Sequence, residues 1–147
     1  MIRSLLIITI ALIHFSCSKN IEDRLIGEWK LDVSYKKELF GRDYFTTGFE
    51  NGIFRFYESG LASYIGINDT LSGYWKSDYY SRQNYNSSTG ESESERLKYL
   101  EVFLANFQNS KILRWDFEEY DFRNNWKNIR AIEYTLGRDR YYEFIKH

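Results

Sequence analysis

The sequence predicts an all-β protein, a small antiparallel up-and-down β-barrel of about eight strands that follows a cleaved N-terminal signal peptide. Aromatic residues make up 19% of the chain, proline is absent and there are nine glycines, a composition that favours pleated, half-buried strands over helices. After residue 24, apolar and polar residues alternate with a period of two, and turn residues separate the alternating runs. Short connections favour antiparallel pairing of successive strands, and closure of the sheet removes exposed edges.

Eight stretches of the chain fit strands, at residues 27–35, 53–58, 61–67, 71–80, 97–107, 112–122, 126–136 and 140–145. A polar and aromatic loop over residues 36–51 follows the first of them. Gly60 supplies the positive φ that a tight hairpin needs between the second and third strands. Gly73 indicates a bulge or a close approach of two backbones within the fourth strand.

Two stretches in the second half of the chain are less regular. Residues 81–95 are almost wholly polar, and they predict a long exposed loop, open to local disorder, rather than a boundary between two domains. In residues 97–107 the apolar side chains fit either a helical stripe or one face of a strand. The alternating neighbours favour the strand, and a helix is the alternative.

The beginning of the chain has the order of residues found in an export signal. Arg3 gives a short positive region, an apolar run follows over residues 5–13, and a small serine precedes Cys17. The run is too short for a lasting bilayer-spanning helix, which needs about 20 apolar residues. Residues 14–17, His-Phe-Ser-Cys, resemble the lipobox that the lipoprotein signal peptidase recognises. This resemblance implies cleavage before Cys17 and a lipid on that cysteine that tethers the protein to a membrane.

The chain therefore divides into a signal peptide over residues 1–16, a lipidated tether over 17–24 and one β-barrel domain over 25–147. Its expected location is the cell envelope, at the outer membrane. Cys17 is the sole cysteine, so the domain forms no internal disulfide. The net charge of −1 gives no electrostatic reason to expect a nucleic acid partner.

A family resemblance begins at residues 25–31, Leu-Ile-Gly-Glu-Trp-Lys-Leu, which are similar to the Gly-x-Trp opening of lipocalins. The similarity is greatest to the short lipocalin-like domains of Gram-negative lipoproteins, whose later strands residues 54–60, 73–76 and 141–146 resemble. Gly27 lets the chain turn into the barrel base without a Cβ clash, and Trp29 plugs the closed end. These two residues are expected to be structural.

The resemblance implies a binding module that holds a small hydrophobic ligand in its barrel. It also implies a late arginine packed over Trp29, for which position offers Arg138 or Arg140. The alternative is an envelope protein with a filled barrel that acts structurally or through a protein partner that the sequence does not identify. The candidate ligand-binding residues are the large apolar residues near strand centres, Phe54, Phe56, Tyr64, Trp75, Phe103 and Trp115.

The sequence does not favour an enzyme. His147 is the only histidine after the predicted cleavage site, which excludes Ser-His-Asp and Cys-His catalysis and His-based metal sites other than one built on the tail. The scattered glycines form no phosphate-binding fingerprint, so we expect no cofactor and no metal. The acidic run over residues 116–121 offers paired carboxylates, but a solvated strand face balanced by Arg114, Arg123 and Lys127 is the preferred interpretation.

Overall fold

The structure, a computed structural model, describes residues 21–147; the predicted signal peptide and Cys17 lie outside the described residues. The described chain consists of strands with one short 3-10 helix, which confirms the all-β prediction and excludes a helix over residues 97–107. None of the helical structure in this part of the chain is long and apolar enough to cross a membrane. The elements are η1 (Ile21–Arg24), β1 (Gly27–Glu38), β2 (Gly41–Tyr44), β3 (Ile53–Phe56), β4 (Leu61–Ile65), β5 (Thr70–Asn86), β6 (Glu91–Asn106), β7 (Lys111–Phe117), β8 (Glu119–Arg123), β9 (Asn128–Glu133) and β10 (Arg140–Lys146).

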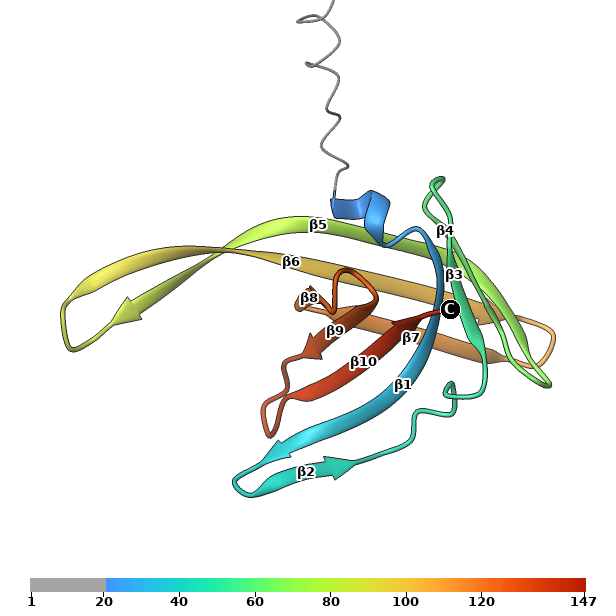
Figure 1. The fold of residues 1–147 in the computed structure, drawn as a ribbon, viewed down its shortest axis with the longest axis horizontal. Helices are drawn as coiled ribbons and strands as arrows, with labels where there is room; N and C mark the ends of the chain where they lie inside the picture. Colours follow the sequence, from blue (N-terminus) through green and yellow to red (C-terminus); the bar gives the residue numbers. More distant parts are fainter. Residues whose placement is uncertain (1–20) are drawn as a thin grey trace, which may run out of the picture.

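All ten strands belong to one antiparallel sheet, in the order β7-β6-β5-β4-β3-β1-β10-β9-β8, with β2 paired to the end of β1 (Figure 1). The sheet is not closed into a barrel, because β7 and β8 are its two edges and do not pair with each other. The chain itself passes from one edge to the other at Glu118. The expected strand over residues 112–122 is therefore divided, since its first part pairs with β6 and its second part pairs with β9. The predicted closed eight-stranded barrel is corrected to an open ten-stranded sheet.

The sheet curves around one main core, to which nine of the strands contribute (Figure 1). A bulge between Leu31 and Val33 shifts the alternation of β1, so that Ser34 pairs with core residue Tyr142 and lies on the inner face. The core is dominated by aromatic side chains. Its large aromatic members are Trp29, Phe49, Phe54, Phe56, Tyr64, Trp75, Trp115, Phe117, Tyr120, Tyr142 and Phe144.

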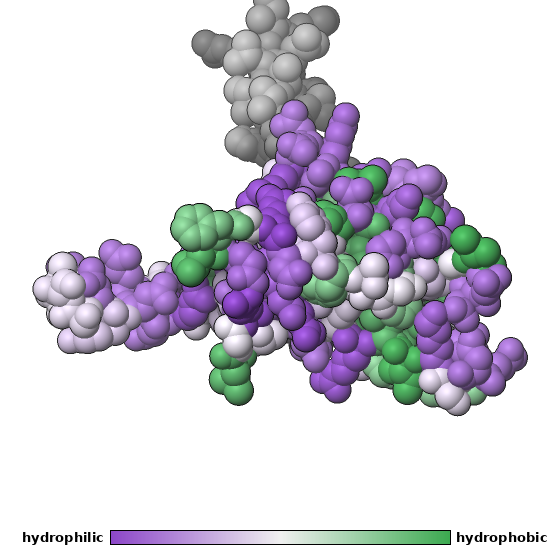
Figure 2. Space-filling model, turned by 90° about the horizontal axis from the view of Figure 1, so that it is seen from below, coloured by the Kyte–Doolittle hydropathy of each residue, from purple (hydrophilic) through white to green (hydrophobic). Residues whose placement is uncertain are grey.

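Beyond the core, β5 and β6 continue together as a long two-stranded ribbon, the arm, which projects from the body (Figure 1). The loop predicted over residues 81–95 is wrong, because these residues form the outer part of this hairpin with the turn after Asn86. Arg82 pairs with Glu95 across the ribbon at 3.1 Å. In the space-filling view the outer part of the arm is purple to nearly white, without hydrophobic green at its tip (Figure 2). Both of its faces are solvated, so no apolar alternation reveals the two strands in the sequence.

Two glycines occupy positions that other residues tolerate poorly. Gly27 has φ +128°, a conformation that L side chains rarely adopt, and it begins β1. Gly73 lies where two backbones approach closely, since a Cβ there would be 2.0 Å from the carbonyl oxygen of Phe103. Both positions therefore need glycine for the sheet to form as it does.

Trp29 is fully buried at the base of the core, where its indole N–H donates to the carbonyl oxygen of Leu25 at 2.7 Å. The cation over its ring is Lys146, whose Nζ lies 5.3 Å from the ring centroid. Neither of the two expected arginines packs over Trp29. Arg138 pairs with a glutamate at the end of β1, and Arg140 pairs with one at the end of β9. A lysine of the last strand thus takes the place that the lipocalin resemblance assigns to an arginine.

Candidate functional site

Five of the six candidate ligand-binding side chains are buried inside the curved sheet. Trp115 lies 5.3 Å from Phe54 between ring centroids, and Phe54 lies 4.9 Å from Tyr64. The ring centroids of Phe56 and Trp75 are 5.6 Å apart. These side chains pack against one another, so the centre of the sheet is filled by the protein's own rings.

Phe103, the sixth candidate, lies on the outer face of β6 and not in the interior. Its ring stacks on Tyr74 of β5 with centroids 5.4 Å apart. The reason is that both faces of β6 carry apolar residues, with Leu104 fully buried on the inner face next to Phe103 on the outer one. Alternation alone cannot decide which set faces inward when both are apolar.

Tyr64 has a structural role in the interior. An added Cβ at Gly52 would be 2.3 Å from its ring, and one at Gly66 would be 2.8 Å away. The outer end of the ring therefore lies close to both glycines, which leave no room there for a side chain. Burial raises the pKa of Tyr64, with Lys111 opposing this shift and Glu50 adding to it. Tyr64 is placed to shape the core and not to contact a ligand.

A cavity of about 430 Å³ lies above the filled core, at the end of the sheet opposite Trp29. Of the six candidates, only Trp115 lines it. The aromatic part of its wall comes from β7, β10 and the chain that precedes β3, and the polar part comes from β1, β10 and two threonines. This space, the mouth cavity, is lined by Lys36, Phe45, Thr46, Thr47, Phe49, Leu113, Trp115, Arg140 and Tyr142.

The segment between β2 and β3 folds inward and forms one wall of the mouth cavity. Phe49 is only 7% exposed, and its ring contacts Trp115 edge-on with centroids 5.9 Å apart. Glu50 holds the segment in shape by accepting hydrogen bonds from the Thr47 hydroxyl and the Gly48 amide, both at 3.0 Å. Burial would raise the pKa of Glu50, but hydrogen bonds from Thr47 and Gly48 outweigh it and lower the pKa. The sequence showed this segment only as a polar and aromatic loop.

Two cations stand at the rim of the mouth cavity. Lys36 and Arg140 are direct partners across β1 and β10, so they lie on the same, inner face. Arg140 forms an ion pair with Glu133 at 3.5 Å. Within the described residues, Lys36 takes part in no ion pair. A second cavity, of about 300 Å³, shares Lys36 and Arg140 with the first and adds Arg138 and Asp43, the cross-strand partner of Lys36 on β2. The rim thus carries three cations, two of which are paired with glutamates.

Below the rim, the inner face carries two further polar groups. Tyr142 donates its hydroxyl to Glu133 at 2.8 Å, and burial together with this hydrogen bond raises the pKa of Tyr142. The Ser34 hydroxyl is buried and has no hydrogen-bond partner among the described residues. A buried polar group without a partner costs free energy, and such groups are rare in proteins. Ser34 precedes Lys36 by one step on the same face of β1, so this end of the interior retains unused hydrogen-bonding capacity.

Of the three cations that the sequence predicts to balance the acidic run over residues 116–121, Arg114 and Arg123 pair with it; within the described residues Lys127 does not, and Arg130 pairs with Asp121 in addition, at 3.0 Å. Asp116 pairs with Arg114 at 2.9 Å, and Asp121 pairs with Arg123 at 3.1 Å. Among the described residues, no group of three His, Cys, Asp or Glu side chains is placed to hold a metal ion.

Comparison of the chain with protein-family models, curated proteins and solved structures gives no match. The interpretation of the site therefore depends on its geometry.

Proposed function

We propose that this protein is a membrane-tethered, lipocalin-like binding module whose ligand is a small organic anion with an apolar or aromatic body. The observation that carries this proposal is the mouth cavity, which combines an aromatic wall with two cations at its rim. Its volume of about 430 Å³ is within the range of known small-molecule sites, which are mostly apolar with a few polar groups that fix orientation. The sequence predicts a small apolar ligand inside a barrel. We propose instead an amphipathic ligand in the mouth cavity of the open sheet.

The chemistry of the wall supports an anion that carries a ring or a short chain. Trp115, Phe49 and Tyr142 offer apolar contact to the body of the ligand. Lys36 and Arg140 suit a carboxylate or a phosphate, and the planar guanidinium can bind two oxygens at once. Lys36 is the more available cation, because Arg140 is paired with Glu133, whereas Lys36 faces Asp43 on β2 but forms no ion pair within the described residues. Long acyl chains are disfavoured, since the space below is filled by aromatic rings.

The proposal is tested by titrating the purified full chain with phenylacetate, octanoate, palmitate and the neutral amide of phenylacetate, monitored by calorimetry. We expect the short carboxylates to bind and the amide and palmitate to bind much more weakly. Lys36→Gln should weaken binding of phenylacetate about 10-fold or more, because a hydrogen bond to a charged group contributes about 1.5–3 kcal/mol. Lys37→Gln is the matched control, since Lys37 is exposed and lies over the Tyr141 ring on the outer face. Equal affinity for the acid and its amide would refute the proposal.

We propose that the tether is a lipid on Cys17, which places the module at the outer membrane. What supports this is the order of a positive residue, an apolar run and a small residue before the sole cysteine. Metabolic labelling with palmitate should mark the wild-type protein and leave Cys17→Ala unlabelled, with the variant lost from the detergent phase on phase separation. Ser18→Ala is the control and should be labelled normally. A labelled Cys17→Ala variant would contradict the tether.

A second candidate function, binding to a protein partner, is favoured by the arm. Within the described chain, β4 pairs with β5 only as far as Tyr74, and β7 pairs with β6 only from Leu100 onward. The outer edges of the arm therefore present unpaired backbone groups, to which an extended peptide can add. Replacing residues 82–95 by a two-residue turn should abolish capture of a partner and leave anion binding unchanged.

A further inference from the structure

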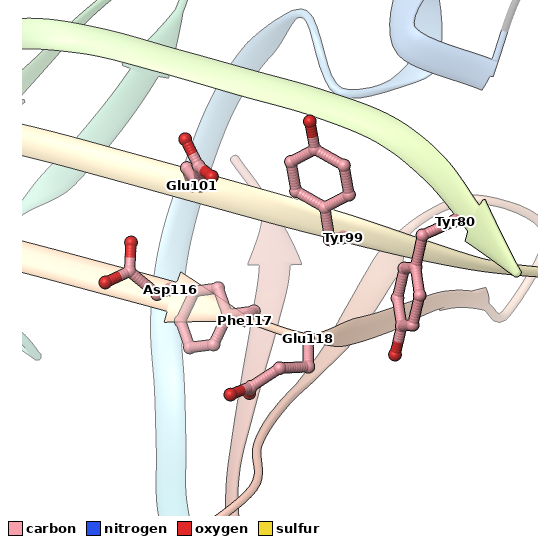
Figure 3. Close-up of a pocket in the computed structure, with 6 residues that line it drawn as sticks. All are labelled: Tyr80, Tyr99, Glu101, Asp116, Phe117 and Glu118. Atoms are coloured by element: carbon pink, nitrogen blue, oxygen red, sulfur yellow. The ribbon is translucent and has the colours of Figure 1, made fainter. Parts of the chain in front are cut away.

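A second hollow lies on the outer face of the sheet, at the seam where β7 leaves β6. The last pair of these strands joins Leu100 to Phe117, after which the chain bends at Glu118 into β8. The bend leaves a groove of about 300 Å³ between side chains that come from β5, β6, β7 and the bend itself (Figure 3). The lining of this outer groove consists of Tyr80, Tyr99, Glu101, Asp116, Phe117 and Glu118.

Aromatic rings form much of the outer groove. Tyr99 stands on β6 at the centre of the site, and Tyr80 reaches from β5 toward the level of Glu118 (Figure 3). Phe117 contributes to the floor, although most of its ring is buried in the core. Both tyrosines are half-buried, so their rings are held in place and still accessible from solvent. The groove therefore offers π faces and apolar surface to a ligand.

Carboxylates form the rest of the lining, and two of them repel each other. Glu101 and Asp116 are direct partners across β6 and β7, and like charges directly opposite each other destabilise a sheet. Glu118 is held in place by the Tyr134 amide, which donates to its Oε2 at 2.9 Å. Two described cations lie beside these carboxylates. Arg114 pairs with Asp116 on an exposed surface, where such pairs contribute little, and Lys76, the cross-strand partner of Glu101 on β5, lies 5.5 Å from the centroid of the Tyr99 ring.

The electrostatics around Tyr80 agree with this geometry. Burial raises the pKa of Tyr80; Arg82 opposes this effect, and Glu119 and Glu118 add to it. The carboxylates thus impose a negative potential on a partly desolvated site. A cation bound there would interact with both the charges and the rings.

We propose that the outer groove binds a methylated ammonium group, such as the trimethylammonium of choline. A bare metal ion does not fit, because no three carboxylates of the described residues are close enough together to ligate one. Lys76 already places a cation over the Tyr99 ring, and the methyl groups of a methylated ammonium can pack against rings while they spread the positive charge over their surface. The site lies on the opposite face of the sheet from the mouth cavity and shares no lining residue with it, so this inference is independent of the proposed function.

The test is an NMR titration of the isotopically labelled full chain with choline, and with 3,3-dimethylbutanol, its neutral isostere. Choline should bind with millimolar affinity and shift the amide signals of the groove, and the isostere should bind several-fold more weakly. Tyr99→Leu should weaken binding of choline about 2- to 30-fold, because a cation over an aromatic ring contributes about 0.5–2 kcal/mol. Tyr85→Leu is the matched control, since Tyr85 is 71% exposed near the arm tip and far along β5 from the groove. Tyr99→Phe should retain binding.

A second variant keeps the test decisive if Tyr99→Leu disturbs folding. The double variant Glu101→Gln, Asp116→Asn removes a repulsion between direct partners together with the attraction of each carboxylate to Lys76 or Arg114, and the amides have nearly the same shape. It should therefore keep the fold and yet bind choline more weakly. Dihexanoylphosphatidylcholine below its micelle concentration distinguishes the source of the ligand. Tighter binding of this lipid than of choline indicates a lipid headgroup, and weaker binding indicates a free methylated amine. Equal binding of choline and its isostere, or unchanged binding in the double variant, would overturn the proposal.

Discussion

Replacement of Gly73 by alanine is expected to destabilise the domain severely. The added Cβ would lie 2.0 Å from the Phe103 carbonyl oxygen, 2.9 Å from its carbonyl carbon and 3.1 Å from the Cα of Leu104. All three atoms belong to the backbone of β6, so no side-chain rotation can relieve the contact. β5 and β6 must separate locally, at a point where β5 is also paired with β4 through Ala62.

The size of the effect follows from what such a separation breaks. Neighbouring strands are held about 4.8 Å apart by their hydrogen bonds, and relieving a 2.0 Å contact requires a movement of more than about 1 Å. Two ladder hydrogen bonds at about 1 kcal/mol each, together with about 1–3 kcal/mol for steric strain, amount to about 3–5 kcal/mol. The free energy of unfolding of a small domain is about 5–15 kcal/mol, so the variant should be near the limit of folding.

Urea denaturation followed by tryptophan fluorescence measures this loss of stability as a lower urea concentration at the midpoint of unfolding. Gly137→Ala is the control, because its Cβ would meet no atom within 4 Å and its φ is not in the left-handed region. Gly137→Ala should therefore unfold at nearly the wild-type midpoint. If Gly73→Ala did so as well, the close approach of β5 and β6 would not exist, and the register of these strands would be wrong.

Three further outcomes test two core residues and the arm. Trp29→Phe should lower the free energy of unfolding by about 2 kcal/mol in urea denaturation, because it loses the hydrogen bond to Leu25 and part of the buried ring. Burial raises the pKa of Tyr120 to about 12, with the hydrogen bond to Ser77 opposing it, so the folded state holds this proton more tightly than the unfolded state. This contribution to stability is complete below pH 10 and is lost as the pH rises toward about 12. In urea denaturation across that pH range, the free energy of unfolding should fall less for Tyr120→Phe than for the wild type. Replacing residues 82–95 by a two-residue turn should change the thermal midpoint little, because nearly all of these side chains are exposed.

The sequence indicated strand positions well because most strands bury one face, and burial imposes alternation on the residues. It failed where that link is absent. The outer part of the arm exposes both faces. Residues 81–95 are therefore polar on both faces, and without apolar residues at every second position the sequence predicts a loop. Phe103 shows the opposite case, in which both faces of β6 are apolar and the periodicity indicates a strand without indicating its inner side. The break at Glu118 gave no signal either, because strand-forming residues continue on both sides of it.

Both candidate binding sites lie at departures from a regular barrel, which explains why the sequence named so few of their residues. Without the bulge between Leu31 and Val33, alternation would place Lys36 on the outer face of β1, away from Trp115. Without the bend at Glu118, β7 would continue along β6 and no groove would open beside Tyr99. A regular closed barrel filled with aromatic rings would offer neither site. The irregularities therefore place polar groups next to aromatic surface, which is what recognition of a charged organic ligand requires.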